Sequence, residues 1–468
     1  MRGYHAFHRR LVGRHPGDHG TQKTPPPGPV PRNVTPEGQK LTVLRSVSFH
    51  FASALALAVS GLLACSDATA ADYSLTGFGT AGYAVSDQKA PYLRYIDKGG
   101  TLRADSLVGL QGEIQFDPQW GATVQVVASA PRYKEDGLAA QVRWAFVSYR
   151  PNNEWLFRVG RLRPPVLINT QNAEVGVTYD QARLPVEVYS FSPVYDVDGG
   201  SFTRTWAGVN QETSLDGYFG ISKIKQRTPF QPGTAQPFIV DRYLPEKIHF
   251  MGLVLAHASG SFVARGGVHR ANLMPDQGRQ FLEDPSPRVI AAPPPFGGTL
   301  FVPGAPYEKV AVNAVTLGVD WDLEKWRVAG EFGRRIVTGT KLASSSDSLY
   351  LTVVRNSGRW APYVTVARIL SAPSSRRYYE QLNATAVPLA AQGAPFFLSP
   401  NYHRSIADSI FLFDQYSTML GTSYNLSITS KLKFEWMRTK IGQASAFVDG
   451  DVQHKSFNVF SMSYNFSF

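Results

Sequence analysis

The sequence has almost no cysteine: Cys65 is the single one among 468 residues. A disulfide framework and a cysteine-based metal site are both excluded, because each needs more than one thiol. Long apolar runs are scarce too, and none of a length that forms a spanning helix follows residue 70. Only 18% of residues are charged, and no phosphate-cradling glycine motif or metal-ligand cluster is present.

Catalytic constellations are equally scarce. Most of the ten histidines lie in the N-terminal leader or in expected loops, and only His249 and His269 fall on expected strands. Neither has a serine or carboxylate at a spacing that identifies a nucleophile–base pair. We therefore expect no enzyme, no metal and no cofactor, with a barrel phospholipase or protease as the minor alternative.

Positive charge is in excess but is not concentrated. The formal net charge is +11, and 8 of the 47 Lys and Arg and 3 of the 36 Asp and Glu lie in residues 1–70. The remaining 39 basic and 33 acidic residues give residues 71–468 a net charge of +6. The basic residues are scattered and form no stripe with interleaved aromatics, so nucleic acid is not an expected partner.

The N-terminal segment has the order of a secretory signal. Residues 47–64 are apolar, with Lys40 and Arg45 before them and Ala68-Thr69-Ala70 after them. These are the charged, apolar and small-x-small parts of such a signal. We expect residues 1–70 to be a leader that is removed, which leaves residues 71–468 as a single domain.

A bacterial lipoprotein signal is the alternative. The stretch Leu62-Leu63-Ala64-Cys65 resembles a lipobox, although leucine is unusual at position 63. On that interpretation Cys65 would be a lipidation site.

Apolar residues at every second position are abundant. The chain ends in FSMSYNFSF, and a strand there would place five large apolar side chains on one face: Phe460, Met462, Tyr464, Phe466 and Phe468. Residues 73–85 alternate in the same way, with tyrosines ten residues apart. A membrane-spanning strand needs about 9–11 residues with aromatics at both ends. For the last strand alone, a soluble sandwich is the alternative.

The same alternation recurs along the chain and predicts about sixteen strands. Their ranges are 73–85, 106–116, 121–129, 140–149, 154–163, 200–208, 217–226, 246–256, 261–271, 308–321, 326–337, 347–355, 359–370, 414–424, 430–441 and 456–468. Short polar turns join them in pairs, and longer segments separate the pairs, at 86–103, 130–139, 164–198, 227–245, 272–306, 338–346, 371–413 and 442–455. This sorting predicts an all-β fold, a transmembrane antiparallel β-barrel with short periplasmic turns and long extracellular loops. Because an open edge is too costly in lipid, the first strand must pair with the last.

An ordered set of motifs resembles the Gram-negative outer-membrane porin superfamily. The set comprises YSLTGFGTAGYA, the hairpin SLVGLQGEIQF-DPQW-GATVQVVA, WLFRVGRLRPPV, DQYSTMLGTSYNLS followed by LKFEWMR, and the aromatic last strand. Within the superfamily the chain is most similar to the proteobacterial single-domain porins and, more loosely, to the phosphate-selective porins. The likeness covers essentially all of residues 73–468.

This resemblance implies a location and a role. It implies a multi-pass barrel in the outer membrane of a Gram-negative bacterium, in contact with outer-membrane lipid, and a water-filled channel for passive diffusion of small hydrophilic solutes or ions. It also implies a homotrimer, and the aromatics Tyr464, Phe466 and Phe468 resemble the signal read by the barrel assembly machinery. The alternative is a structural, adhesive or plugged outer-membrane barrel with little conductance.

The segment 164–198 follows the fifth expected strand and mixes acids with many apolar residues. Trimeric porins are similar in folding the loop at this place inward, where it narrows the channel. The resemblance implies a constriction in which three loop residues, Glu174, Asp180 and Arg183, face Arg143 and Arg158 on the wall and set up a transverse field. The alternative is an outer loop held by ordinary surface ion pairs.

Once the apolar face is assigned to lipid, the opposite parity of each strand faces the lumen. This assignment places six charged residues on the lumen wall: Glu113, Arg327, Glu331, Arg335, Lys433 and Glu435. A charge that faced lipid at mid-depth would cost about 2–4 kcal/mol for Arg or Lys. The alternative for each of these residues is a solvated wall position without a specific role.

Overall fold

The computed structural model describes residues 72–192, 194, 196–227, 243–276, 288–291, 299–302, 309–384, 410–450 and 452–468. The expected signal segment 1–70 and the alternative lipidation site Cys65 lie outside the described residues. In the described ranges, no helix combines the length and the apolar character needed to cross a membrane.

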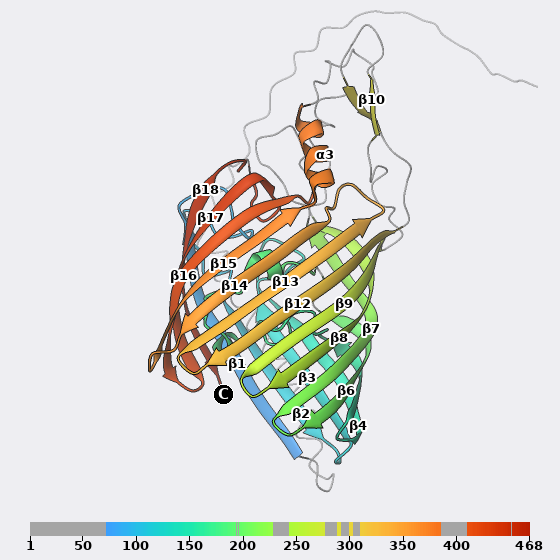
Figure 1. Cartoon of the computed structure of the whole chain (residues 1–468), viewed down its shortest axis with the longest axis vertical. Helices are drawn as coiled ribbons and strands as arrows, with labels where there is room; N and C mark the ends of the chain where they lie inside the picture. Colours follow the sequence, from blue (N-terminus) through green and yellow to red (C-terminus); the bar gives the residue numbers. More distant parts are fainter. Residues whose placement is uncertain are drawn as a thin grey trace, which may run out of the picture. The chain divides into compact units, whose positions relative to one another are not determined.

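Sixteen antiparallel strands close into one barrel (Figure 1). They are β1 (Asp72–Ser86), β2 (Leu107–Gln115), β3 (Trp120–Ser129), β4 (Ala139–Asn152), β5 (Trp155–Leu162), β6 (Val197–Gly208), β7 (Gln211–Arg227), β8 (Tyr243–Ser259), β9 (Phe262–Pro275), β12 (Val310–Leu323), β13 (Trp326–Thr338), β14 (Ser346–Arg355), β15 (Trp360–Ser371), β16 (Phe413–Ser427), β17 (Ser430–Ser445) and β18 (Ser456–Ser467). Each of the sixteen strands predicted from the alternation is present, so the predicted fold is confirmed. A separate hairpin, β10 (Arg288–Ala291) and β11 (Thr299–Val302), was not predicted.

The barrel closes between its first and last strands. β1 and β18 pair without interruption from Phe78↔Ser467 to Ser86↔Val459. Beyond that ladder, the amide of Gly77 donates to the carbonyl of Phe468 and the amide of Phe468 donates to the carbonyl of Gly77, both at 2.9 Å. The ring of Phe468 lies over Gly77, where a Cβ would collide with it. The glycine therefore gives the terminal ring its place at the seam.

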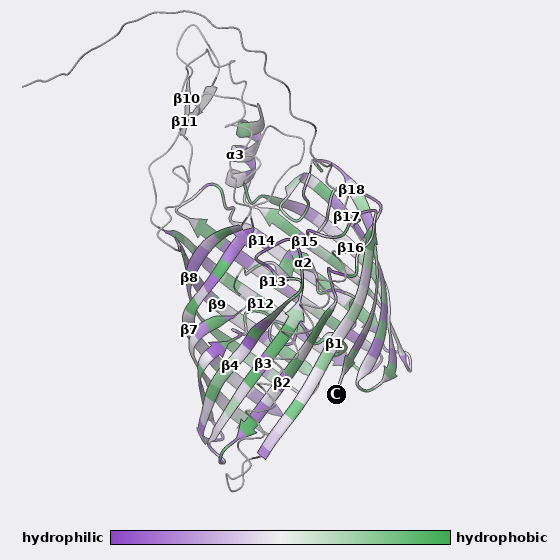
Figure 2. Ribbon diagram, turned by 180° about the vertical axis from the view of Figure 1, so that it is seen from behind, coloured by the Kyte–Doolittle hydropathy of each residue, from purple (hydrophilic) through white to green (hydrophobic). Residues whose placement is uncertain are grey.

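The outward face of the wall is apolar. Large apolar side chains at alternate positions are exposed on it, among them Leu351, Val364, Phe434, Phe460 and Met462. Figure 2 shows the alternation as green and purple bands along the strands. Exposed tryptophans gather near the short turns: Trp120, Trp206, Trp321, Trp326 and Trp360. An apolar belt with an aromatic girdle is the surface that a bilayer requires of a barrel.

The connections alternate between short and long, as predicted. At the short-turn end, backbone with positive φ turns the chain within a few residues, for example at Gly260 (φ 57°) and Gly358 (φ 61°). An even number of strands, short turns at one end and long loops at the other are the architecture of bacterial outer-membrane barrels. The chain is a barrel of this architectural class.

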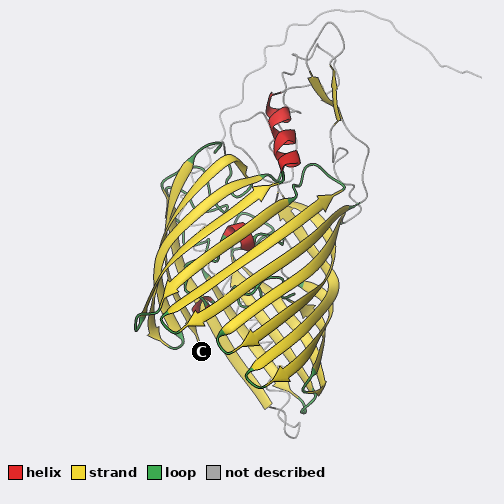
Figure 3. Ribbon diagram, viewed as in Figure 1, coloured by secondary structure: helices red, strands yellow, loops and turns green. Residues whose placement is uncertain are grey.

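The segment between β5 and β6 lies inside the barrel. Its short helix α2 (Val186–Tyr189) contacts β13, β14 and β15, and its 3-10 turn η1 (Gly176–Thr178) contacts β1 and β18. Figure 3 shows α2 as a red turn within the ring of strands. We call residues 163–196 the inner loop. The other helix, α3 (Pro373–Ala384), belongs to the connection between β15 and β16.

The seam gives a first prediction. Replacing the terminal residue in Phe468→Ser removes the ring over Gly77 and the last member of the outward aromatic row, so we expect most of the protein to fail to assemble while synthesis continues. The measurement is heat-modifiable gel mobility of isolated membranes. Phe460→Ser is the matched control, because Phe460 lies on the same face of the same strand but away from the terminus. Equal amounts of folded barrel for the two variants would contradict the prediction.

Candidate functional site in the barrel lumen

Both ends of the inner loop are tied to the wall by one buried ion cluster. Arg143 of β4 and Arg163 each contact Glu174, through Nη2–Oε1 at 3.0 Å and Nη2–Oε2 at 2.9 Å. The same two arginines contact Asp196, at 3.5 Å and 3.2 Å. Burial would raise the pKa of Glu174, but the adjacent guanidinium groups of Arg163 and Arg143 lower it. The two guanidinium groups therefore compensate the buried carboxylate of Glu174.

The structure brings Glu174 and Arg143 together, and it places Asp180 and Arg183 against residues other than the expected Arg143 and Arg158. Asp180 contacts Lys431 Nζ at 3.0 Å and accepts a hydrogen bond from Ser423 at 2.7 Å, and Arg183 forms an ion pair with Asp105. These partners lie on β16, β17 and the β1–β2 loop. Asp180 and Arg183, only six and nine positions after Glu174, therefore contact β16, β17 and the β1–β2 loop and not β4 or β5.

Arg158, the second wall residue of the expected constriction, has no loop partner among the contacts of the described residues. Its guanidinium carbon lies 5.6 Å from the ring centroid of Phe146 on the neighbouring strand β4. Arg163 and Asp196, which complete the ion cluster, were not identified as site residues from the sequence. The one available sign was the position of Arg163 two residues after Arg161, at the point where β5 ends.

Three of the six predicted wall residues hold the inner loop, two of them by direct hydrogen bonds and the third through a tyrosine of β15. Glu331 accepts from the amide of Ile168 at 2.7 Å, Lys433 donates to the carbonyl of Gln181 at 2.8 Å, and Glu435 accepts from Tyr363 at 2.8 Å. The phenol of Tyr363 in turn accepts from the amide of Ala182 at 3.1 Å. Part of the lumen wall is therefore occupied in binding the inner loop.

The remaining three predicted wall residues lie in different surroundings. Arg327 forms an ion pair with Asp320 at 2.6 Å and lies 3.9 Å from Asp180 of the loop. Glu113 is exposed and accepts a hydrogen bond from Gln111 at 2.6 Å. Arg335 lines a cavity that is described next.

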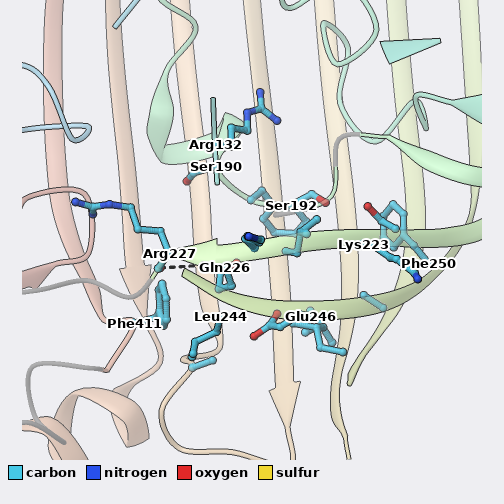
Figure 4. Close-up of a pocket in the computed structure, with 18 of the residues that line it drawn as sticks. Arg132, Ser190, Ser192, Lys223, Gln226, Arg227, Leu244, Glu246, Phe250 and Phe411 are labelled. Carbon is cyan, nitrogen blue, oxygen red and sulfur yellow. Dashed lines mark hydrogen bonds between the residues drawn. The ribbon is translucent and has the colours of Figure 1, made fainter. Parts of the chain in front are cut away.

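A cavity of about 1700 Å³ remains beside the inner loop. It lies against β4, β7–β9, β12 and β13, and loop residues from Ser190 to Asp196 border it. Figure 4 shows Leu244, Glu246 and Phe250 of β8 around this space together with Phe411. The loop and the cavity thus divide the lumen between them.

The two strand histidines are not part of a catalytic arrangement. His269 is buried, with Nδ1 2.6 Å from the Tyr218 hydroxyl and Nε2 2.9 Å from the Thr316 hydroxyl. His249 has the opposite strand parity to the buried residues Ile248 and Phe250 and therefore lies on the outward face. Among the residues that the structure describes, no group of three or more His, Cys, Asp or Glu side chains could hold a metal ion.

A buried glutamate gives a second prediction. Glu187 of α2 accepts hydrogen bonds from Gln415 at 2.7 Å and from Ser417, while its Oε2 is buried without a partner. Burial raises the pKa of this carboxyl. A raised folded-state pKa contributes stability at low pH that is lost as pH rises through it. Ionisation would leave a buried acceptor unsatisfied, at about 1–3 kcal/mol.

We therefore expect the free energy of unfolding of the wild type to fall as the pH rises above the ordinary titration range of a glutamate carboxyl, and we expect Glu187→Gln to flatten that dependence. The measurement is denaturant unfolding followed by tryptophan fluorescence at several pH values. Glu212→Gln, at an exposed position of β7, is the control and should keep the wild-type slope. A wild-type slope that persists in Glu187→Gln would contradict the prediction.

No protein-family model matches the chain, and no curated protein sequence matches it. Among solved structures, the chain is similar to the anion-selective porin from Comamonas acidovorans (12% identity, TM-score 0.48, 85% of this chain and 100% of that chain). It is also similar to the outer membrane channel DcaP of Acinetobacter baumannii (12%, 0.48, 85% and 97%) and to OprB of Pseudomonas putida (10%, 0.46, 85% and 94%). At these identities and TM-scores the likeness is one of general architecture and says nothing about the solute.

Proposed function

We propose that the protein is a channel of the Gram-negative outer membrane that passes small hydrophilic solutes or ions by passive diffusion, without covalent chemistry. The observation that carries this proposal is the division of the lumen. The inner loop is seated on one side, and about 1700 Å³ of space remains on the other. Barrels of sixteen to eighteen strands enclose an aqueous channel unless something fills it.

The contacts of the inner loop favour a narrowing over a mobile gate. Its two ends are held by the cluster of Arg143, Arg163, Glu174 and Asp196, and its middle is held by Asp180 on Lys431. Each is a charge-assisted contact with little exposure, and breaking one would leave an uncompensated buried charge. The loop should therefore stay in place while solutes pass.

A plugged barrel with little conductance is the second candidate, and the same contacts favour it, because they fill the lumen beside β13–β18. A planar-bilayer recording of the purified full chain decides between the two. We expect steady, ohmic channels. Repeated insertion of folded protein without current steps would support the plugged barrel.

The homotrimer and recognition by the barrel assembly machinery are further proposals. Cross-linking in membranes can test the first, and assembly assays can test the second.

Ion preference gives a third prediction. Glu174 and Asp180 each neutralise arginines or lysines of the wall, so Glu174→Gln/Asp180→Asn leaves Arg143, Arg163 and Lys431 less compensated. The lumen potential should become more positive, and anions should pass more readily. Reversal potentials under a salt gradient measure this change. The change should shrink at high ionic strength, since the Debye length is about 10 Å at 0.1 M and about 3 Å at 1 M.

The matched control neutralises two acids outside the lumen cluster. Glu154→Gln/Asp117→Asn makes the same changes at exposed positions of the short turns and should leave the reversal potential unchanged. An unchanged potential at low salt in the loop variant would place Glu174 and Asp180 outside the conduction path.

A further inference from the structure

One part of the cavity wall, on β8, β9, β12 and β13, is apolar where the lumen of a water-filled barrel is ordinarily polar. Its inward residues form rows, in which each residue pairs with the one opposite it on the neighbouring strand. One row joins Phe250, Ala271, Val312 and Val337 across β8, β9, β12 and β13. The next row toward the long loops joins Ile248, Leu273 and Val310. The inner loop adds Phe191 to the same cavity. A fully hydrated solute gains nothing from such a surface, whereas an apolar group does.

Arg335 lies in the row directly below these apolar residues. That row joins Gly252, His269, Ala314 and Arg335 across the same four strands. Along β13, Glu331 and Gly333 contact the inner loop, through Tyr189 and through the ring of Phe191. Arg335 is the next inward residue, so it stands at the floor of the cavity, where the inner loop begins to fill the lumen.

The charge of Arg335 is uncompensated within the described part of the chain. Its guanidinium carbon lies 4.9 Å from the ring centroid of Phe413, and its Nε is buried without a hydrogen-bond partner. It forms no ion pair with a described residue. Two other arginines of the cavity, Arg143 and Arg227, are both in ion pairs with carboxylates. An unpaired, partly desolvated guanidinium is a site for an anion, and its planar fork fits a carboxylate.

Glu246, an acid of the cavity wall that forms no ion pair with a described residue, is too far away to neutralise Arg335. Glu246 lies on β8 six residues from Gly252, the β8 member of the row that contains Arg335. At about 3.3 Å per residue this is about 20 Å along the strand. The separation is about twice the Debye length at 0.1 M salt. The two charges therefore do not form a site for one small zwitterion.

We infer that the cavity binds amphipathic organic anions, with one carboxylate on Arg335 and an aromatic or aliphatic part against the two apolar rows. The inference deepens the proposed function, on which it rests, by naming the class of solute. The cavity is larger than the roughly 300–1,000 Å³ of ordinary ligand pockets, so the anion binds with water around it and remains free to leave. Such weak binding suits a channel, which must release what it binds. An inorganic anion would leave the apolar rows unused, and an organic cation would be repelled by Arg335.

The test measures block of the ion current of the purified full chain in planar bilayers. The probes are 3-phenylpropanoate, propanoate, 3-phenylpropan-1-ol and 3-phenylpropylamine, which separate the contributions of the charge and of the ring. Of the four probes, we expect 3-phenylpropanoate to need the lowest concentration to halve the current. Arg335→Gln should raise that concentration about tenfold or more, as the loss of a charge-assisted hydrogen bond does. Leu273→Asn should weaken block by 3-phenylpropanoate and leave block by propanoate unchanged.

Arg334→Gln is the matched control. Arg334 is the neighbouring residue, but it faces outward in an exposed ion pair with Asp347, so its loss should not alter the block. Heat-modifiable gel mobility confirms that each variant is folded. The inference is overturned if 3-phenylpropanoate blocks the Arg335→Gln channel at the same concentration as the wild-type channel. It is also overturned if propanoate blocks the wild type as well as 3-phenylpropanoate does, or if 3-phenylpropylamine blocks it at the lowest concentration of the four probes. If the wild type carries no current, the proposed function fails. Equilibrium dialysis of 3-phenylpropanoate against detergent-solubilised wild type and Arg335→Gln then decides the inference by itself.

Discussion

The pairing of every backbone amide and carbonyl in the wall is the constraint on which the rest of the structure depends. Within hydrocarbon an unpaired group costs several kcal/mol, so a sheet that crosses a membrane cannot keep an edge. The chain meets this constraint where β1 and β18 join, and the pair between Gly77 and Phe468 extends the ladder to the last residue. Gly77 and Phe468 therefore depend on each other, because the terminal ring occupies the space that a side chain at position 77 would need.

Closure also explains how much could be predicted from the sequence. A strand with lipid on one side and the lumen on the other must alternate strictly, and that local pattern located all sixteen barrel strands. Lys433 and Phe434 show why the pattern is reliable. They are neighbours in the chain, but Lys433 faces the lumen and Phe434 faces outward, and neither side chain would be stable in the place of the other. The hairpin of β10 and β11 and the helix α3 escaped prediction because they lie in long connections, where no bilayer imposes a period.

The contacts of the candidate site were less predictable, for a related reason. Parity identifies which residues face the lumen, and Glu331 and Lys433 do so as expected. Parity carries no information about which loop residue meets which wall residue. Asp180 contacts Lys431 and Arg183 contacts Asp105 because the inner loop crosses the lumen on a path fixed by its two ends. Those ends are held by Arg163 and Asp196, which lie 33 residues apart in the chain and show no shared period.

Seating the inner loop on one side gives the two halves of the lumen different chemistry. Where the loop lies, buried charges of the wall are matched by loop groups, since an unmatched buried charge would destabilise the barrel. Glu174, Asp180 and Arg183 all take part in this matching. On the open side, β8, β9, β12 and β13 present two apolar rows, and Arg335 has no such partner among the described residues. A charge can remain unmatched there because the cavity leaves room for water beside it. On β13 the change from one half to the other falls between Gly333, which packs against the inner loop, and Arg335, which lines the open cavity, whereas on β4 Arg143 serves both halves because it holds the loop and borders the cavity.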